Sequence, residues 1–310
     1  DMYHTICTGY GGLLATMAGI IRKKPLMLTE HGIYSREREE EIIRASWVLP
    51  TFKRQWIRFF YMLSDAVYQQ ATAISSLFQR AMETQIELGA AAEKCRVIGN
   101  GINYARFSGI PMKMENGTID IAAVIRIAAI KDVKTLIYAY KELTLRVPNT
   151  RLHILGGVDD EEYAEECHAL VHELRLETLS FVGQVDVVKY MEQIDFTVLT
   201  SISEGQPLSV LESFAAARPA VTTDVGCCRE LIRGSAYDPY GPAGYCVPPM
   251  NRQALADALE WMCRDPEKRR QMGQAGQRRA EHYFRQEMMM AKYRAMYEEV
   301  NEQWQASASN

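Results

Sequence analysis

The sequence lacks the features that mark secreted, membrane-spanning or nucleic-acid-binding chains. Its seven cysteines are odd in number and include no Cys-x-x-Cys pair, which argues against a disulfide framework or a zinc site. No apolar run approaches the ~20 residues that span a bilayer, and no signal-peptide pattern opens the chain. A formal net charge of −4, with Lys and Arg spread throughout, argues against a nucleic-acid partner. We therefore expect a cytoplasmic enzyme with reduced thiols.

The second part of the chain alternates short apolar runs with segments of helical periodicity. A length of 310 residues exceeds one typical domain, and 47% hydrophobic residues suffice for two cores. A helix is expected over 133–143, where apolar residues recur at helical spacing. The expected strands lie at 119–127, 152–155, 179–182, 196–200 and 220–223. This alternation predicts an α/β protein with a parallel, doubly wound sheet.

The first part of the chain has the same alternation, with one unusual stripe. We expect a helix at 13–20, strands at 25–29 and 71–75, and a long helical region from Ser35. Within that region five apolar positions recur at helical spacing: Phe52, Trp56, Phe59 or Phe60, Leu63 and Val67. Such a stripe usually forms part of a core. The basic residues Lys53, Arg54 and Arg58 between them leave a membrane-side or acceptor-side role open.

Composition also indicates a boundary between two domains. Residues 109–117 mix Gly, Pro and polar residues without periodicity, as expected of an interdomain linker. The predicted organisation is an N-terminal domain over 1–108, a second domain over 109–285, and a C-terminal helix over 286–310.

The most informative stretch is residues 203–212, where two glutamates eight positions apart bracket a Gly-x-Pro turn. It follows an apolar strand, and Pro207 suits the first position of a helix. The free N–H groups and the dipole at such a helix start can hold a diphosphate. Glu212, about a turn and a half into the helix, could accept hydrogen bonds from ribose hydroxyls. The alternative is an ordinary strand-to-helix connection with solvated glutamates.

This arrangement resembles the retaining glycosyltransferases of family four, which have the GT-B fold of two Rossmann-like domains facing a cleft. Glu204 and Glu212 match the family's pair of glutamates separated by seven residues, and Arg126 followed by Lys131 matches its two cations. Four further segments fall in family order: 29–32, 97–102, 181–183 and 244–249. The resemblance implies that the C-terminal helix crosses back to the first domain.

The resemblance implies that Arg126 and Lys131 hold the diphosphate of a nucleotide-sugar donor. In that role they would act in catalysis without a metal and without a cofactor other than the donor itself, a UDP-sugar. The alternative is that either residue pairs with Asp132 or with a helix end.

For the carboxylates the resemblance implies that Glu204 faces the donor sugar and Glu212 binds the ribose. Backbone groups of the intervening turn would contact the sugar and the diphosphate: Gly205, Gln206, Pro207 and Leu208. Gln206 stands where the family often has an aromatic residue, which could change the donor preference. The family is thought to use a front-face route in which the leaving phosphate deprotonates the acceptor, so no nucleophile is assigned.

Two further residues complete the expected site. His31 would hydrogen-bond the donor sugar near the reacting centre, the alternative being a histidine packed at a strand end. Gly183 would lie beside the donor, in the turn after a strand.

Within the family, residues 28–34 and 130–135 resemble the Pel exopolysaccharide glycosyltransferases (PelF). This resemblance implies transfer of a hexose or N-acetylhexosamine from a UDP-sugar to a growing exopolysaccharide. It also implies an inner-membrane synthase complex as partner, with peripheral attachment through partner proteins. Two alternatives stay open: another GT-B enzyme, using ADP-glucose or acting as an epimerase, or a non-catalytic donor-binding module.

Residues 1–5 resemble an internal segment of the family rather than a start. We therefore expect the N-terminal domain, as given, to lack its first strands.

Overall fold

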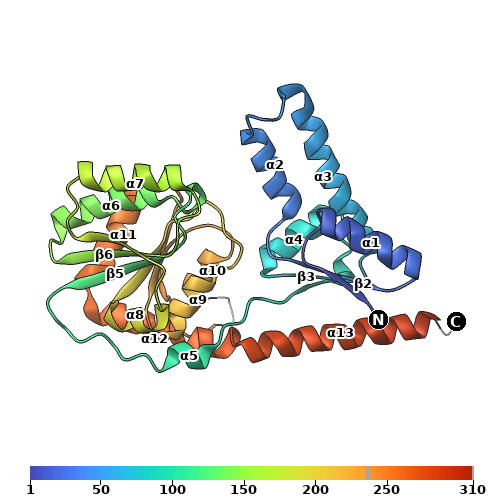
Figure 1. Ribbon diagram of the computed structural model, residues 1–310. Coiled ribbons are helices and arrows are strands. Elements are labelled where there is room, and N and C mark those ends of the chain that lie inside the picture. The colour runs from blue at the N-terminus through green and yellow to red at the C-terminus, as the bar shows by residue number, and fades with distance from the viewer. Residues whose placement is uncertain (235–237, 309–310) are drawn as a thin grey trace. The chain divides into compact units, whose positions relative to one another are not determined.

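The computed structural model describes residues 1–234 and 238–308. The chain divides into two compact units, Asp1–Asn100 with Glu287–Asn310, and Gly101–Gln286 (Figure 1). Each unit is built on a parallel sheet of its own. Ser309 and Asn310, the last residues of the expected C-terminal helix, lie outside the described residues.

The first unit is a four-stranded parallel sheet in the order β1-β2-β3-β4. Leu26 and Leu28 of β2 pack against Val67 and Tyr68 of α3. Met27, between them in sequence, packs with Met296 and Val300 of α13, since alternate residues of a strand point to opposite faces. The elements are β1 (Tyr3–Thr5), α1 (Tyr10–Arg22), β2 (Leu26–Glu30), α2 (Tyr34–Arg44), α3 (Pro50–Gln70), β3 (Ala73–Ser76), α4 (Gln79–Glu87), β4 (Cys95–Val97) and α13 (Gln286–Ala308).

The aromatic stripe of α3 divides into a buried and an exposed half. Phe60, Leu63 and Val67 are buried, as a core interpretation predicts. Phe52 and Trp56 are 53% and 40% exposed. The difference arises because α3 and α2 form a hairpin that projects from the sheet, so the N-terminal turns of α3 have only α2 beside them (Figure 1).

The second unit is a six-stranded parallel sheet in the order β10-β9-β8-β5-β6-β7. Read from β5, this is the doubly wound order in which the direction of strand addition reverses between β5 and β8. Its elements are α5 (Tyr104–Ser108), β5 (Ile119–Val124), α6 (Val133–Arg146), β6 (Thr150–Leu155), α7 (Glu161–Glu173), β7 (Leu179–Gly183), α8 (Val187–Tyr190), β8 (Phe196–Leu199), α9 (Leu208–Ala215), β9 (Ala220–Thr223), α10 (Cys228–Arg233), β10 (Gly244–Val247), α11 (Arg252–Arg264) and α12 (Pro266–Tyr283).

The strand expected at 119–127 ends earlier, at Val124. Beyond that point the chain keeps hydrogen bonds on the β6 side: Ile125 N donates to Leu155 O, and Ile127 N donates to Gly157 O. Pairing with β8 involves only Ile121 and Ala122. The segment after Val124 therefore does not pair with β8, and it lies at the carboxyl edge of the sheet, beside the switch point.

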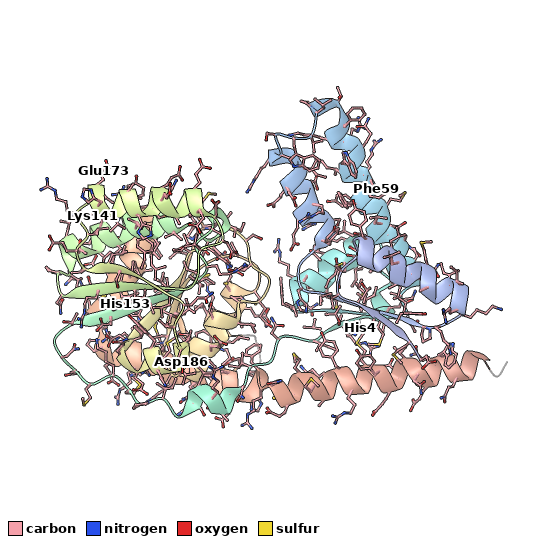
Figure 2. The ribbon with its side chains drawn as sticks, viewed as in Figure 1. His4, Phe59, Lys141, His153, Glu173 and Asp186 are labelled. Carbon is pink, nitrogen blue, oxygen red and sulfur yellow. The ribbon has the colours of Figure 1, made fainter. Side chains whose placement is uncertain are left out.

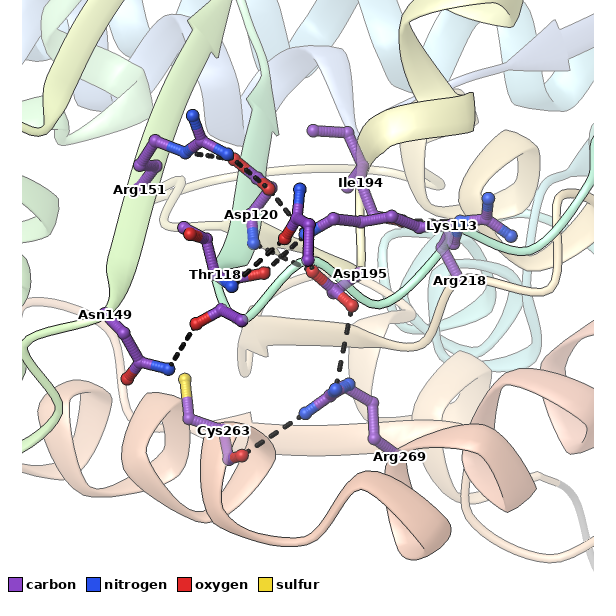
Figure 3. Close-up of polar contacts among 12 residues, drawn as sticks. Lys113, Thr118, Asp120, Asn149, Arg151, Ile194, Asp195, Arg218, Cys263 and Arg269 are labelled. Atoms are coloured by element: carbon purple, nitrogen blue, oxygen red, sulfur yellow. Dashed lines mark hydrogen bonds and ion pairs between the residues drawn. The ribbon is translucent and has the colours of Figure 1, made fainter.

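The segment 109–117 is fastened to the second unit (Figure 3). Lys113 Nζ forms ion pairs of 2.5 Å with Asp120 and 2.6 Å with Asp195. Arg218, which is fully buried, donates to the carbonyl oxygens of Pro111, Met191 and Ile194. A stretch that looks like a linker in composition is thus held along its length by buried cations.

Asp120 is the centre of this network, at the amino end of β5. It accepts from His153 Nε2 at 2.9 Å and pairs with Lys113 and Arg151 (Figure 3). Burial by itself would raise the pKa of Asp120, but these hydrogen bonds and charges outweigh it and lower the pKa to about 2. The carboxylate is therefore ionised in the folded unit at neutral pH. His153 lies on β6, on the strand next to β5 (Figure 2).

Candidate functional site

A cavity of about 490 Å³ opens at the carboxyl edge of the second sheet. It lies at the reversal of strand order, where ligands bind in open α/β sheets. The loops that follow β5, β6, β7 and β8 all contribute to it. The wall includes Arg126 and Lys131 after β5, Gly156 and Gly157 after β6, Gln184 and Val185 after β7, and Glu204, Pro207, Leu208 and Ser209 after β8.

An ion pair between Lys131 and Glu204 forms one side of the cavity. Lys131 Nζ lies 2.6 Å from Glu204 Oε1, and the two side chains are only 18% and 14% exposed. Ser201 Oγ donates to the same carboxylate oxygen at 2.6 Å. The backbone supports this geometry, because Ile202 N donates to Ile130 O at 2.9 Å. The pair is therefore pre-formed between residues 73 positions apart in the chain.

Arg126 lies in the same wall but is far more exposed than Lys131. Its side chain is 68% exposed and its guanidinium pairs with Asp159. The expected alternative partner, Asp132, instead caps α6 by accepting from Thr135 N. Because exposed ion pairs contribute about 0–1 kcal/mol, an anionic ligand can take over the guanidinium at little cost.

The start of α9 supplies a third source of positive potential. Sequence alone places Pro207 at the first helical position, whereas in the structure Pro207 is extended, with ψ 118°, and caps a helix that begins at Leu208. Leu208 and Ser209, the first two residues of the helix, line the cavity, and the first N–H groups of a helix have no acceptor within it. The helix dipole adds partial positive charge at the same point.

Two glycines not expected from the sequence allow close backbone contacts, one in the cavity wall and one behind the glutamate turn. Gly156 has φ +150°, and a Cβ there would lie 2.0 Å from Ile125 O. Gly226 has φ +53°, and a Cβ there would lie 2.2 Å from Glu204 O. The loop of Gly226 holds the glutamate turn from behind, since Cys227 N donates to Gly205 O at 3.1 Å. The Gly-Gly pair at 156–157 directly after an apolar strand is a signal that could have identified the first of them.

Four of the expected residues lie in the unit but not in the cavity wall. Gly183 ends β7 with φ +80°, and its carbonyl accepts from Gly156 N at 2.8 Å. Gln206 is 8% exposed, so its side chain is turned inward. Gly205 lies beneath the loop of Cys227. Glu212 is partly buried in α9, and this burial raises its pKa, an effect that the charge of Arg106 offsets only in part.

His31 belongs to the first unit and is exposed directly after β2. The residue before it, Glu30, is 2% exposed and accepts four hydrogen bonds. The donors are Thr8 Oγ1, Tyr34 N, Tyr68 OH and Gln85 Nε2. The hydrogen bonds of Glu30 thus fix the backbone position of His31 at the carboxyl edge of the first sheet.

The described residues contain neither a metal-binding cluster nor a membrane-spanning helix. No group of three or more His, Cys, Asp or Glu side chains within 1–234 and 238–308 is placed to hold a metal ion. None of the helices in the described part of the chain is long and apolar enough to cross a membrane.

Two parallel α/β units, one with a cavity at the switch point of its sheet, place the chain in the doubly wound class of α/β proteins. Comparison with protein families is more specific. Residues 113–279, more than half of the chain, match the family Glycosyl transferases group 1, and the chain belongs to this family. Residues 1–93 match a domain of unknown function, DUF3492.

Individual relatives are distant but cover most of the chain. The MMP alpha-(1->4)-mannosyltransferase of Mycolicibacterium hassiacum is 24% identical over 95% of this chain and 69% of its own. The capsular polysaccharide biosynthesis glycosyltransferase CapM of Staphylococcus aureus is 23% identical over 94% of this chain and 74% of its own. Among solved structures, Anabaena HepE in complex with UDP superposes with a TM-score of 0.78 and 19% identity, covering 96% of this chain and 79% of HepE. The GT-B fold expected from the sequence is confirmed.

Proposed function

We propose that this chain is a retaining, metal-independent glycosyltransferase that moves a hexose or N-acetylhexosamine from a UDP-sugar to a growing exopolysaccharide of the Pel type. The observation that carries the proposal is the convergence of Arg126, Lys131 and the start of α9 on one cavity. UDP and UDP-glucose in structures of HepE, and the capsular role in the name of CapM, support the donor and acceptor classes.

Charge development during glycosyl transfer explains this arrangement. As the donor's bond to its diphosphate breaks, negative charge grows on the leaving phosphate. Arg126 can contact two phosphate oxygens through its planar fork, Lys131 adds a compact charge, and the N–H groups of α9 add donors. These groups would do what a divalent metal does in other enzymes. The leaving phosphate would then take the proton of the acceptor hydroxyl on the same face.

The carboxylates have separate roles in this proposal. Glu204 would accept hydrogen bonds from the donor sugar, while Lys131, its partner in the ion pair, would turn to the diphosphate when the donor binds. Glu212 would bind the ribose and Gly183 would border the donor, while Gly205 and Gln206 would contribute backbone groups. His31 would hydrogen-bond the sugar near the reacting centre. A saccharide acceptor and an inner-membrane synthase complex, holding the protein at the cytoplasmic face, complete the proposal.

Calorimetric titration with UDP, uridine and ADP tests the donor site. The intact chain should bind UDP more tightly than ADP, and Arg126→Ala should weaken UDP far more than uridine, because the lost partner is the diphosphate. Arg264→Ala is the matched control, since Arg264 is 59% exposed and pairs with a single glutamate of its own helix. Equal losses of UDP and uridine affinity in Arg126→Ala would overturn the assignment of Arg126.

Release of UDP from UDP-glucose and from UDP-N-acetylglucosamine, with and without saccharide acceptor, tests for transfer. Acceptor-dependent release supports an enzyme, whereas tight UDP binding with no release in any condition supports a donor-binding module. His31→Ala should reduce release and leave UDP affinity unchanged, because His31 belongs to the first unit and all the residues proposed to contact the nucleotide belong to the second.

A further inference from the structure

The tip of the α2–α3 hairpin carries large apolar side chains in water. We define the hairpin tip as residues 43–58, comprising the end of α2, the turn and the start of α3. Five of its apolar side chains are between 40% and 72% exposed: Ile43, Trp47, Leu49, Phe52 and Trp56. Isolated exposed apolar residues are ordinary, but so many within one short segment mark an interaction surface.

These side chains are not needed for the core of the hairpin. Ile42, Phe60 and Leu63 form that core and are buried. Phe59, further along α3, lies beside them (Figure 2). Trp56 packs on Phe59 and Phe60, with ring centroids 5.8 and 6.2 Å apart, and still leaves 40% of its surface exposed. The apolar surface of the hairpin tip therefore extends beyond the hairpin core, where no other described side chains of the first unit cover it.

The charge of the hairpin tip is of one sign. Between Ile42 and Ser64 the sequence has four cations and no acidic residue, in a chain whose net charge is −4. The cations are Arg44, Lys53, Arg54 and Arg58. Phe52 and Trp56 are four residues apart and share one face of α3, while Arg54 and Arg58 share the opposite face. The helix start thus has an apolar face and a basic face.

We propose that the hairpin tip docks on the surface of an anionic lipid bilayer. Tryptophan and phenylalanine beside lysine and arginine are the residues of helices that lie in the interface, where rings enter the headgroup region and cations meet lipid phosphates. The positive charge of the hairpin tip argues against a second copy of this chain as its binding partner. In a symmetric dimer the same patch faces itself, so four cations would oppose four cations. The contact is direct and needs no partner protein.

Co-sedimentation with vesicles tests the proposal on the whole chain. Vesicles of phosphatidylcholine mixed with phosphatidylglycerol should carry the protein down, and vesicles of phosphatidylcholine alone should leave it in solution. Added salt should release the bound protein, because screening weakens the charge term. The double variant Trp47→Ser with Phe52→Ser should lower the partition coefficient at least about tenfold. Arg54→Gln with Arg58→Gln should lower it as well.

Trp261→Ser is the matched control, since Trp261 is also exposed but lies on α11 in the other unit. It should sediment like the unchanged chain. UDP affinity and circular dichroism, measured on each variant, show that the protein is folded. Equal sedimentation with neutral and anionic vesicles, or wild-type sedimentation of the Trp47/Phe52 variant, would overturn the proposal. A second result would also overturn it: the unchanged chain forms a dimer, the Trp47/Phe52 variant is a monomer, and neither of them binds vesicles.

Discussion

The ion pair between Lys131 and Glu204 gives the sharpest test of the site, because each partner has a different expected role. Lys131→Met replaces the lysine with an unbranched side chain of similar shape, shorter only by the ammonium nitrogen, and removes the charge. It leaves Glu204 only 14% exposed, with Ser201 as its remaining hydrogen-bond donor. Removing one partner of a fully buried pair costs about 3–5 kcal/mol. Since both side chains retain some contact with water, we expect about 1–3 kcal/mol of lost stability.

The effect on ligands should separate the two residues. Lys131→Met removes a charge-assisted contact worth about 1.5–3 kcal/mol, so UDP affinity should fall about 10- to 100-fold while uridine affinity is unchanged. Glu204→Gln should leave UDP affinity at or above the original value, because a competing anion has gone. The same variant should weaken UDP-glucose relative to UDP, because the contact to the sugar is impaired.

Calorimetry with the three ligands and urea unfolding, on both single variants and the double variant, measure this cycle. The stability losses of the single variants should not add, since each removes the same pair. Unchanged UDP affinity in a folded Lys131→Met variant would refute the role of Lys131. Additive stability losses would refute the claim that the ion pair is coupled.

The remaining predictions concern three other carboxylates. Asp159→Asn should free Arg126 and raise UDP affinity by up to about fivefold, the range of an exposed ion pair, and a loss of affinity measured by calorimetry would show that Asp159 assists binding. The pKa of Asp120 is lowered from 3.8 to about 2 in the folded protein. At pH values above 3.8 the ionised carboxylate should therefore stabilise the fold by about 2 kcal/mol. That stability should be lost as pH falls from 3.8 to about 2, and Asp120→Asn should remove this part of the pH dependence of urea unfolding. Glu30→Gln replaces an acceptor oxygen with an NH₂ group that faces hydrogen-bond donors. It should lower the free energy of unfolding in urea by about 2–3 kcal/mol, whereas Glu87→Gln, at an exposed position, should change it little.

Some features of the chain could be read from sequence because their cause is local. Apolar runs at 152–155, 179–182 and 220–223 fall within the observed β6, β7 and β9, since strand formation depends on neighbouring residues. The helical pattern from residue 133 corresponds to α6 for the same reason. Regular alternation of such elements was enough to predict parallel sheets. Arg126 and Lys131 were expected from the resemblance to the family, and both line the cavity.

Features made by distant parts of the chain could not be read in this way. The partner of Arg126 is 33 residues away and the partner of Lys131 is 73 residues away. Nothing in local periodicity encodes which side chains meet across two strand ends. The packing of Gly226 under the glutamate turn is of the same kind.

Composition and periodicity also did not show which segments pack against the rest of their unit and which are exposed. Residues 109–117 have the content of a linker, yet Lys113 and the buried Arg218 fix them to the second unit. The apolar stripe of α3 has the period of a core, yet its first half is exposed. The sequence by itself determined the α/β class, because strands and helices depend on local pattern, and its family resemblance pointed to Arg126 and Lys131, which both line the cavity. Only the tertiary structure decided which side chains meet, since ion pairs and burial depend on contacts between segments far apart in the chain.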